Sequence, residues 1–238
     1  MELLRKIGER EGFGELLGDG VKRAAESIGG IACEYAMHVK GLEFPAHDPR
    51  ALASHALGYA TGSIGAAHME TAGADHLENC MELDDPRTNP ELGFPVAMQR
   101  FDNEGKGRLV AKMQDFTCLM DSITVCLFSS MNPAMKPSDY LTALNSATGW
   151  DMAFDEFMLT GERIHNLKRM FSVKRGISRK DDILPARILT HRLTSGGTRG
   201  NLFNLGAMLN EYYSVRGWSE EGIPTREKLI ELGLEECL

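Results

Sequence analysis

The sequence predicts a mainly α-helical protein, and three observations support this. Apolar residues recur at three-, four- and seven-residue spacings over long stretches, helix-capping residues precede several of those stretches, and strand signals are few. At 238 residues, of which 42% are hydrophobic and 25% charged, the chain is long enough for one large domain or two small ones with a hydrophobic core.

Three short helices are expected in the first sixty or so residues. Residues 1–12 and 20–28 have the pattern of amphipathic helices, and a glycine-rich stretch separates them. Asp48 and Pro49 supply the N-cap and the first-turn proline of a third helix, which is expected to run to about Thr61.

The middle of the chain is expected to hold a loop followed by the longest helix. Residues 70–100 contain Asp-Pro, Asn-Pro and Phe-Pro steps, so they are predicted to be mostly loop. A helix is predicted from about Asn103 to Phe128, and its buried stripe is formed by Leu109, Met113, Phe116, Met120 and Leu127.

The last hundred residues continue the helical pattern. Ser138 is the expected N-cap of a helix through Ala147, and Asp151 opens another that runs to about Val173. The charged segment 174–185 ends that helix. Two closing helices are predicted over residues 199–214 and 225–234, the second capped by Thr225.

Composition excludes several classes of protein. Lys and Arg number 26 and Asp and Glu 34, which gives a net charge of −8 and argues against nucleic acid as the main partner. No apolar run approaches the roughly 20 residues that span a bilayer. Because the N-terminus is amphipathic rather than a signal peptide, the expected compartment is the cytoplasm.

Five scattered cysteines argue against a disulfide framework, and no CxxC or CxxxC pair is present. In a continuous helix, Cys118 and Cys126 would lie about 12 Å apart along the axis, too far for one small cluster. The chain can therefore offer one cysteine to a cluster. The others are expected to be structural: Cys33, Cys80, Cys118 and Cys237.

The segment Asp121-Ser122-Ile123-Thr124-Val125-Cys126 is the most informative part of the sequence. A carboxylate accepts hydrogen bonds from N–H groups and a thiolate binds soft metals, so this pair can hold a nitrogen heterocycle beside an iron–sulfur centre. The alternatives are an aspartate on a solvated helix flank and a cysteine that acts as a small core residue.

His68 is the second candidate. It follows a run of glycine and alanine over residues 62–67, and small residues leave an imidazole standing in a pocket. Its ordinary pKa near neutrality suits proton transfer. The alternative is a histidine that only satisfies a helix end.

An ordered series of peptides resembles the tungsten-containing aldehyde:ferredoxin oxidoreductase family, and it extends over nearly the whole chain. The matching peptides are Glu34–Glu43, Asp48–Arg50, Leu57–Thr61, Gly65–His68, Asp121–Phe128, Ala147–Asp151, Gly161–Ile164, Ser178–Asp182, Leu184-Pro185, Tyr212-Tyr213 and Arg216–Trp218. Each peptide alone is moderately specific, whereas the set in this order is highly specific.

The resemblance implies a fold. Family members have an N-terminal base domain that carries a bis-pterin tungsten cofactor, followed by two mainly α-helical domains that cover it. This sequence looks like those two packed helical domains, which correspond to residues 1–135 and 136–238, without the base. The CxxCxxxC run that supplies three cluster ligands, and the first pterin-binding DxxGL motif, belong to that upstream part.

The resemblance also implies a site. The second family motif, DxxGLC, maps onto Asp121 to Cys126. Asp121 would hydrogen-bond the pterin, Thr124 and Val125 would lie against the cofactor, and Cys126 would be the fourth ligand of a [4Fe–4S] cluster. His68 would lie near the metal as an acid or base.

Two departures from the family pattern are visible. Thr124 stands where the family has glycine, a residue that lets a helix backbone approach a flat ring. Ser63-Ile64-Gly65 stands where the family usually has Asn-Arg-Gly, so an arginine is lost.

The function implied is oxidation of an aldehyde to a carboxylate at tungsten, with electrons leaving through [4Fe–4S] to ferredoxin. Both cofactors would require the upstream region, so the chain alone is expected to be inactive and to expose an apolar face where that region docks. A homo-oligomer is possible. The aldehyde, and the choice between tungsten and molybdenum, stay open.

Two alternatives remain. The first is a non-catalytic, truncated helical module or partner subunit that lacks its own cofactor, and Thr124 and Ile64 favour it. The second is a relative that acts on another substrate, such as an aromatic acyl-CoA.

Overall fold

The structure, a computed structural model, describes residues 1–78, 88–130 and 135–237. Helices dominate these residues, which confirms the mainly α prediction. The sheet found within them is a two-stranded antiparallel hairpin of β1 (His38–Val39) and β2 (Leu42–Glu43), with Val39 opposite Leu42.

The α-helices are α1 (Glu2–Glu9), α2 (Phe13–Leu17), α3 (Val21–Ile28), α4 (Ala32–Tyr35), α5 (Ala53–Thr61), α6 (Ala74–Leu77), α7 (Lys106–Ser122), α8 (Leu127–Ser130), α9 (Pro137–Thr148), α10 (Phe154–Val173), α11 (Ala186–Thr190), α12 (Leu205–Arg216) and α13 (Arg226–Glu231). Short 3₁₀ helices are η1 (Pro49–Ala51), η2 (His68–Thr71), η3 (Pro90–Leu92), η4 (Arg179–Asp181) and η5 (Glu235–Cys237).

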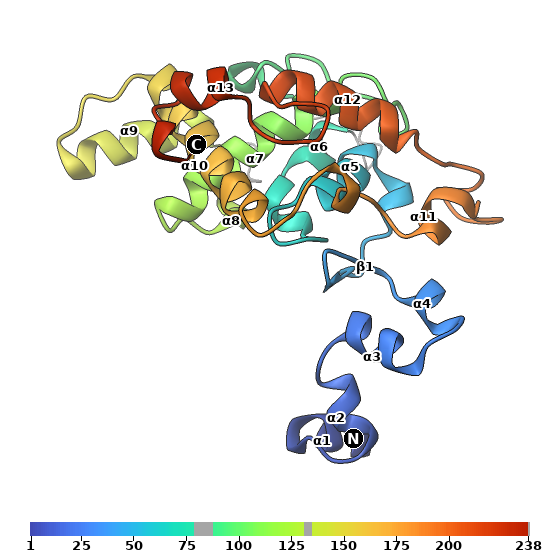
Figure 1. Cartoon of the computed structure of the whole chain (residues 1–238). Helices are drawn as coiled ribbons and strands as arrows, with labels where there is room; N and C mark the ends of the chain where they lie inside the picture. The colour runs from blue at the N-terminus through green and yellow to red at the C-terminus, as the bar shows by residue number, and fades with distance from the viewer. Residues whose placement is uncertain (79–87, 131–134, 238) are drawn as a thin grey trace.

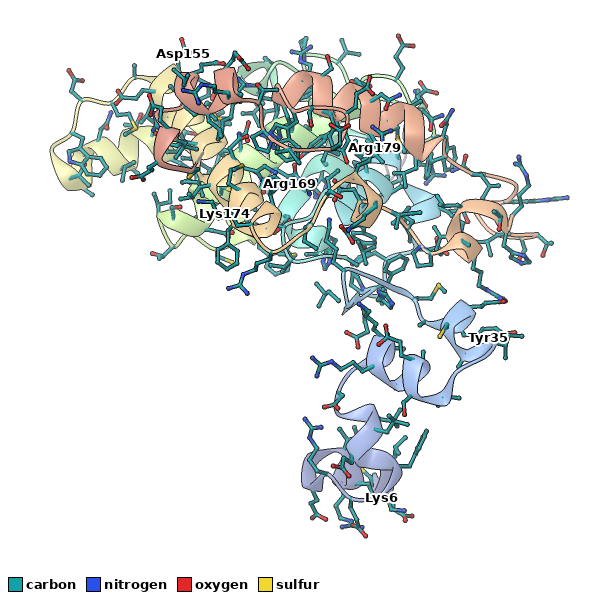
Figure 2. All side chains as sticks on the ribbon, in the orientation of Figure 1. Lys6, Tyr35, Asp155, Arg169, Lys174 and Arg179 are labelled. Atoms are coloured by element: carbon teal, nitrogen blue, oxygen red, sulfur yellow. The ribbon has the colours of Figure 1, made fainter. Side chains whose placement is uncertain are left out.

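The chain forms a helical body with an N-terminal arm. Figure 1 shows α1 to α4 leading away from the body, with α1 and α2 farthest from it. Figure 2 places Lys6 and Tyr35 on this arm, whereas Arg169 lies inside the body. Helix α1 packs against α2 but contains no buried residue. The arm therefore contributes little to the hydrophobic core of this chain.

Helix α7 is the centre of the body, packed between α10 and α12. Two hydrophobic clusters share it: one contains Tyr59, Val110, Met208, Tyr212 and Trp218, and the other contains Leu109, Phe116, Met120, Tyr140 and Phe157. Both clusters draw residues from before and after position 135. The division into domains at 1–135 and 136–238 stays a prediction.

A buried polar network joins α7 to its neighbours. Arg216 of α12 forms an ion pair with Asp115 of α7, and both side chains are almost fully buried. The Tyr212 hydroxyl donates to Gln114 Oε1 at 2.6 Å and lies 3.0 Å from His165 Nε2 of α10. Since buried polar groups must be satisfied, this network fixes how the three helices face one another.

The hairpin is fastened to the body by a second buried group. Lys40 Nζ donates to the Ala60 carbonyl at 2.6 Å, just before the end of α5, and lies 2.8 Å from Asp182 Oδ1. Asp182 is also bound by Arg169 at 2.7 Å and accepts from the Tyr213 hydroxyl at 2.6 Å. These contacts hold the hairpin against the end of α5 and against the residue that follows η4.

Several helix boundaries differ from the sequence prediction. Helix α10 is capped at Ala153 rather than at Asp151, and Asp48 caps η1, so that α5 begins only at Ala53. The helix expected from Asn103 to Phe128 ends at Ser122, so α10, with 20 residues, is longer than α7, with 17. The stripe of α7 is buried as predicted up to Met120, but Leu127 lies beyond the helix in α8.

The cap of α9 also differs. Its N-cap is Lys136 rather than Ser138: Asp139 accepts a hydrogen bond from the Lys136 backbone N–H at 2.8 Å, and Pro137 occupies the first turn. Ser138 instead binds Glu91, its hydroxyl donating at 2.8 Å. The cap predicted at Thr225 is confirmed, since its hydroxyl accepts from the Lys228 N–H at 3.2 Å.

Candidate functional site

The Asp121–Cys126 segment is a turn that ends α7. The Val125 N–H donates to the Met120 carbonyl at 3.0 Å, and the Thr124 N–H donates to the Asp121 carbonyl at 3.2 Å. This pair of bonds is the Schellman motif, in which the residue after the cap adopts the left-handed conformation. Thr124 does so, with φ 58°. The site is therefore built at a helix end rather than along a helix.

The turn exposes the chemically useful side chains and buries its anchor. Asp121, Thr124 and Cys126 are exposed, whereas Val125 is half-buried against the cluster that contains Met120. Across the described ranges, the carboxylate of Asp121 and the thiol of Cys126 have no side-chain hydrogen bond or ion pair. An unpaired carboxylate can accept hydrogen bonds from the N–H groups of a ring that another part of the enzyme carries. An unpaired thiol can likewise bind an iron ion held elsewhere.

The remaining cysteines differ from Cys126. Cys118 is buried one turn before the site, and burial raises the pKa of its thiol to about 11. Cys237 is buried, and the exposed Cys33 donates to the Ala25 carbonyl at 3.6 Å. Cys80 lies outside the described residues. The buried positions of Cys118 and Cys237 agree with a structural role.

His68 begins η2 and is half-buried, and the glycines before it permit a close chain approach. A Cβ on Gly62 would lie 2.3 Å from the Gly65 carbonyl oxygen. One on Gly65, whose φ is 114°, would lie 2.3 Å from the Val39 carbonyl oxygen. Both positions therefore require glycine, which lets the loop before His68 pack directly on the hairpin.

A polar bridge connects η2 to α7 near the turn. Glu70 accepts from the Ser63 N–H at 2.7 Å, which closes the loop before His68. Lys168 of α10 lies 3.8 Å from Glu70 Oε1, and its Nζ also lies 3.9 Å from Cys118 Sγ. Since Cys118 is one helical turn before Asp121, the two candidate motifs belong to one connected region of the body.

His68 belongs to a cluster of three imidazoles. Its ring centroid lies 4.6 Å from that of His47 and 6.3 Å from that of His55, and His47 and His55 stack at 5.8 Å. His55 is buried, and its Nδ1 has no hydrogen-bond partner. Sequence reasoning missed this cluster, because no regular spacing links the three positions.

Burial determines which of these rings stays neutral. It lowers the pKa of His55 to about 4, although the carboxylate of Asp75 acts in the opposite direction. Burial, followed by the neighbouring His47, also lowers the pKa of His68. At neutral pH, His55 is therefore an uncharged ring beside His47 and His68.

The described parts of the chain contain no group of three or more His, Cys, Asp or Glu side chains that could hold a metal ion alone. The roles of His68, Asp121, Thr124, Val125 and Cys126 stay predictions. In the same ranges, no helix is both long and apolar enough to cross a membrane.

Comparison with known families identifies the class of the chain. Residues 1–234 match the family model described as aldehyde ferredoxin oxidoreductase, domains 2 and 3. The helical fold and this match define the C-terminal, helical part of an oxidoreductase. More narrowly, the chain belongs to the aldehyde ferredoxin oxidoreductase family.

Curated relatives agree with this assignment. The chain is 39% identical to the tungsten-containing aldehyde ferredoxin oxidoreductase of Pyrococcus horikoshii over 99% of its length and 36% of the relative's. It is 40% identical to that of Pyrococcus furiosus, over 98% and 36% respectively. A Pyrococcus furiosus protein named aliphatic sulfonate oxidoreductase, WOR-like subunit, is 29% identical, over 99% and 34%. The chain thus spans about a third of these proteins.

A solved structure supports the fold. The active site complex BamBC of benzoyl coenzyme A reductase, in complex with 1,5-dienoyl-CoA, superposes with a TM-score of 0.70 at 24% identity. The match covers 99% of this chain and 38% of that one. Helical architecture, rather than substrate, is what this likeness shows.

Proposed function

We propose that this chain is the helical part of an enzyme that oxidises aldehydes to carboxylates at a tungsten-bispterin centre. The observation that carries the proposal is the exposed Asp121–Cys126 turn, which leaves a carboxylate and a thiol unpaired in a chain that matches the family over residues 1–234. The upstream part of such an enzyme would supply the cofactor base and three cluster cysteines.

Within that enzyme, each residue has a distinct task. The pterin-bound metal supplies the redox chemistry. Asp121 would accept hydrogen bonds from N–H groups of the pterin, and Cys126 would provide the fourth thiolate of the [4Fe–4S] cluster. Val125, packed against the core, keeps the turn rigid. The cluster would supply electron transfer to ferredoxin.

His68 is the proton-transfer group of the proposed site. It is half-buried at the start of η2, and η2 is tied toward α7 through Glu70 and Lys168. Oxidising an aldehyde with water releases protons, and a neutral imidazole accepts them near neutral pH.

The experiment is to produce the chain with and without the upstream region and to measure tungsten and iron by mass spectrometry. The complete enzyme is expected to bind both metals and to oxidise aldehydes with ferredoxin as acceptor. Cys126→Ser should lose most cluster iron, whereas Cys33→Ser, which replaces another exposed cysteine, should keep it. Stoichiometric tungsten and iron in the chain produced without the upstream region would overturn the proposal.

The second candidate is a non-catalytic helical module or a partner subunit without its own cofactor. Ile64 favours it, because an exposed isoleucine (63% accessible) stands where the family usually has arginine. Thr124 favours it as well, since the glycine of the motif is lost. If the chain assembled with the upstream region contains no tungsten or iron, the module is the better description.

A further inference from the structure

His47 gives His68 a connection to solvent. The two ring centroids lie 4.6 Å apart, at an interplanar angle of 42°. His47 is exposed, and it lines a cleft of about 460 Å³ together with Tyr35, Met37 and Phe44. In this pair, His68 is therefore the half-buried ring, and His47 is the ring that contacts water in the cleft.

The backbone around His47 holds its ring in place. The Tyr59 hydroxyl of α5 donates to the His47 carbonyl at 3.2 Å, and the His47 N–H donates to the Pro45 carbonyl at 2.7 Å. The ring of His47 also stacks on His55, with an interplanar angle of 9°. The proximity to His68 is thus fixed by contacts on several sides.

The charged groups around the three rings leave two of them to carry protons. Asp75 attracts protons toward His55 and His68, but burial keeps His55 neutral. Asp48, next to His47 in the chain, is neutralised by Arg50 at 2.5 Å. The phenol of Tyr59 stays protonated because burial raises its pKa. With His55 held neutral, His47 and His68 are the two rings of the cluster that remain for a proton path.

We propose that His47 accepts protons from His68 and releases them to water in the cleft. The inference rests on the proposed function. An aldehyde and a water molecule yield a carboxylic acid, two protons and two electrons; the electrons leave through the cluster to ferredoxin, and the protons leave through His68 and then His47. One hydrogen bond or one bridging water suffices for each transfer.

The first test needs no cofactor. Histidine C2–H signals are titrated by NMR in the chain and in His47→Gln, which keeps a polar side chain without a titrating ring. Because His47 lowers the pKa of His68, the substitution should raise it. His191→Gln is the matched control, since His191 is also exposed but lines a different cleft. An unchanged pKa of His68 in His47→Gln would show that the rings are uncoupled and overturn the proposal.

The second test uses the complete enzyme loaded with tungsten. His47→Ala should lower kcat about 10-fold or more at equal tungsten content. Added imidazole should restore most of the loss, because the shortened side chain leaves room beside an open cleft. His191→Ala should keep the wild-type rate in every buffer. If His47→Ala does not load with tungsten, His47→Gln is measured against the same control.

The outcomes separate the two proposals. A loaded wild-type enzyme that oxidises no aldehyde would refute the proposed function, and the proton path with it. An active wild type with an undiminished His47→Ala would refute only the proton path. A loss of rate that imidazole does not restore would assign His47 a structural role and would also refute it.

Discussion

Thr124 holds a backbone conformation that suits glycine better than a β-branched residue. With φ 58° it is the left-handed residue of the Schellman motif that ends α7. The sequence suggested that a glycine here would serve close approach to a flat ring. The structure adds a second reason, because the turn itself requires positive φ.

Thr124→Gly should therefore stabilise the chain. A residue with a Cβ in the left-handed conformation costs roughly 1–2 kcal/mol, and glycine removes this cost. Glycine also raises the conformational entropy of the unfolded chain, which offsets part of the gain, so we expect the free energy of unfolding to rise by about 1 kcal/mol. Urea unfolding measures the change. Ser122→Gly, in the last turn of α7, is the control and should lower stability by up to about 1 kcal/mol. Destabilisation by both substitutions would contradict the assigned turn.

His55 should make stability depend on pH. Its pKa is about 4 in the folded chain and near 6.5 when unfolded. Above pH 6.5 both states hold a neutral ring. As pH falls from 6.5 to 4, the unfolded state binds the proton first, so stability falls by an amount on the order of 3 kcal/mol.

The measurement compares urea unfolding at pH 7.5 and pH 5 for the wild type and for His55→Asn. The substitution should shrink the loss of stability between the two values, whatever its effect at pH 7.5. His191→Asn, at an exposed ring, should behave like the wild type. Equal pH dependence in all three chains would show that His55 is not the buried, neutral ring described.

At the scale of elements, the sequence predicted helices well and their ends less well. Helix α7 was predicted to continue past Thr124 because threonine carries no stop signal, whereas glycine would have. The predicted cap at Ser138 failed because Asp139 binds the Lys136 N–H and Pro137 opens the helix. The approach of His47 to His68 depends on how the loop after β2 packs on α5, which no local pattern encodes.

The ion pair between α7 and α12 should be costly to break from one side. Asp115 is buried, and burial raises its pKa to about 6 despite the adjacent Arg216. Arg216→Met would leave that carboxyl buried without its partner, and the free energy of unfolding should fall by about 3–5 kcal/mol. The double variant with Asp115→Leu should lose less than the single one.

A double-mutant cycle by chemical denaturation tests this. Arg5→Met, which breaks an exposed pair with Glu9 in the arm, is the control and should cost less than about 1 kcal/mol. The expectation is wrong if the double variant is less stable than Arg216→Met. The attraction within the ion pair would then exceed the free-energy cost of desolvating its two charges.

At the scale of the whole molecule, exposed apolar side chains indicate a surface that another domain or subunit would bury. Ile64, Phe128 and Trp150 are 63%, 75% and 58% accessible. The first two lie beside or within the candidate motifs. The sequence predicts an exposed apolar face wherever the upstream region docks. Single exposed apolar residues are ordinary, so their position near the site is the informative part.

In isolation, the chain should self-associate and bind a hydrophobic dye. Size exclusion and dye fluorescence measure this, and replacing both Ile64 and Phe128 by serine should reduce dye binding. In the matched control, serine replaces the exposed Ile28 and Ile31 of the arm, and this change should reduce dye binding less. A clean monomer that binds no dye would count against a docking face at the site.

The sharing of α7 by both hydrophobic clusters has a consequence for how the body opens. Leu109, Phe116 and Met120 face one cluster and Val110 and Ala111 the other, so α7 cannot be released while either remains packed. Its amide protons should exchange with solvent deuterium at one common, slowest rate along the helix, set by global unfolding. Amides of α1, which buries nothing, should exchange orders of magnitude sooner, so the arm will be labelled while the centre of the body is still fully protected.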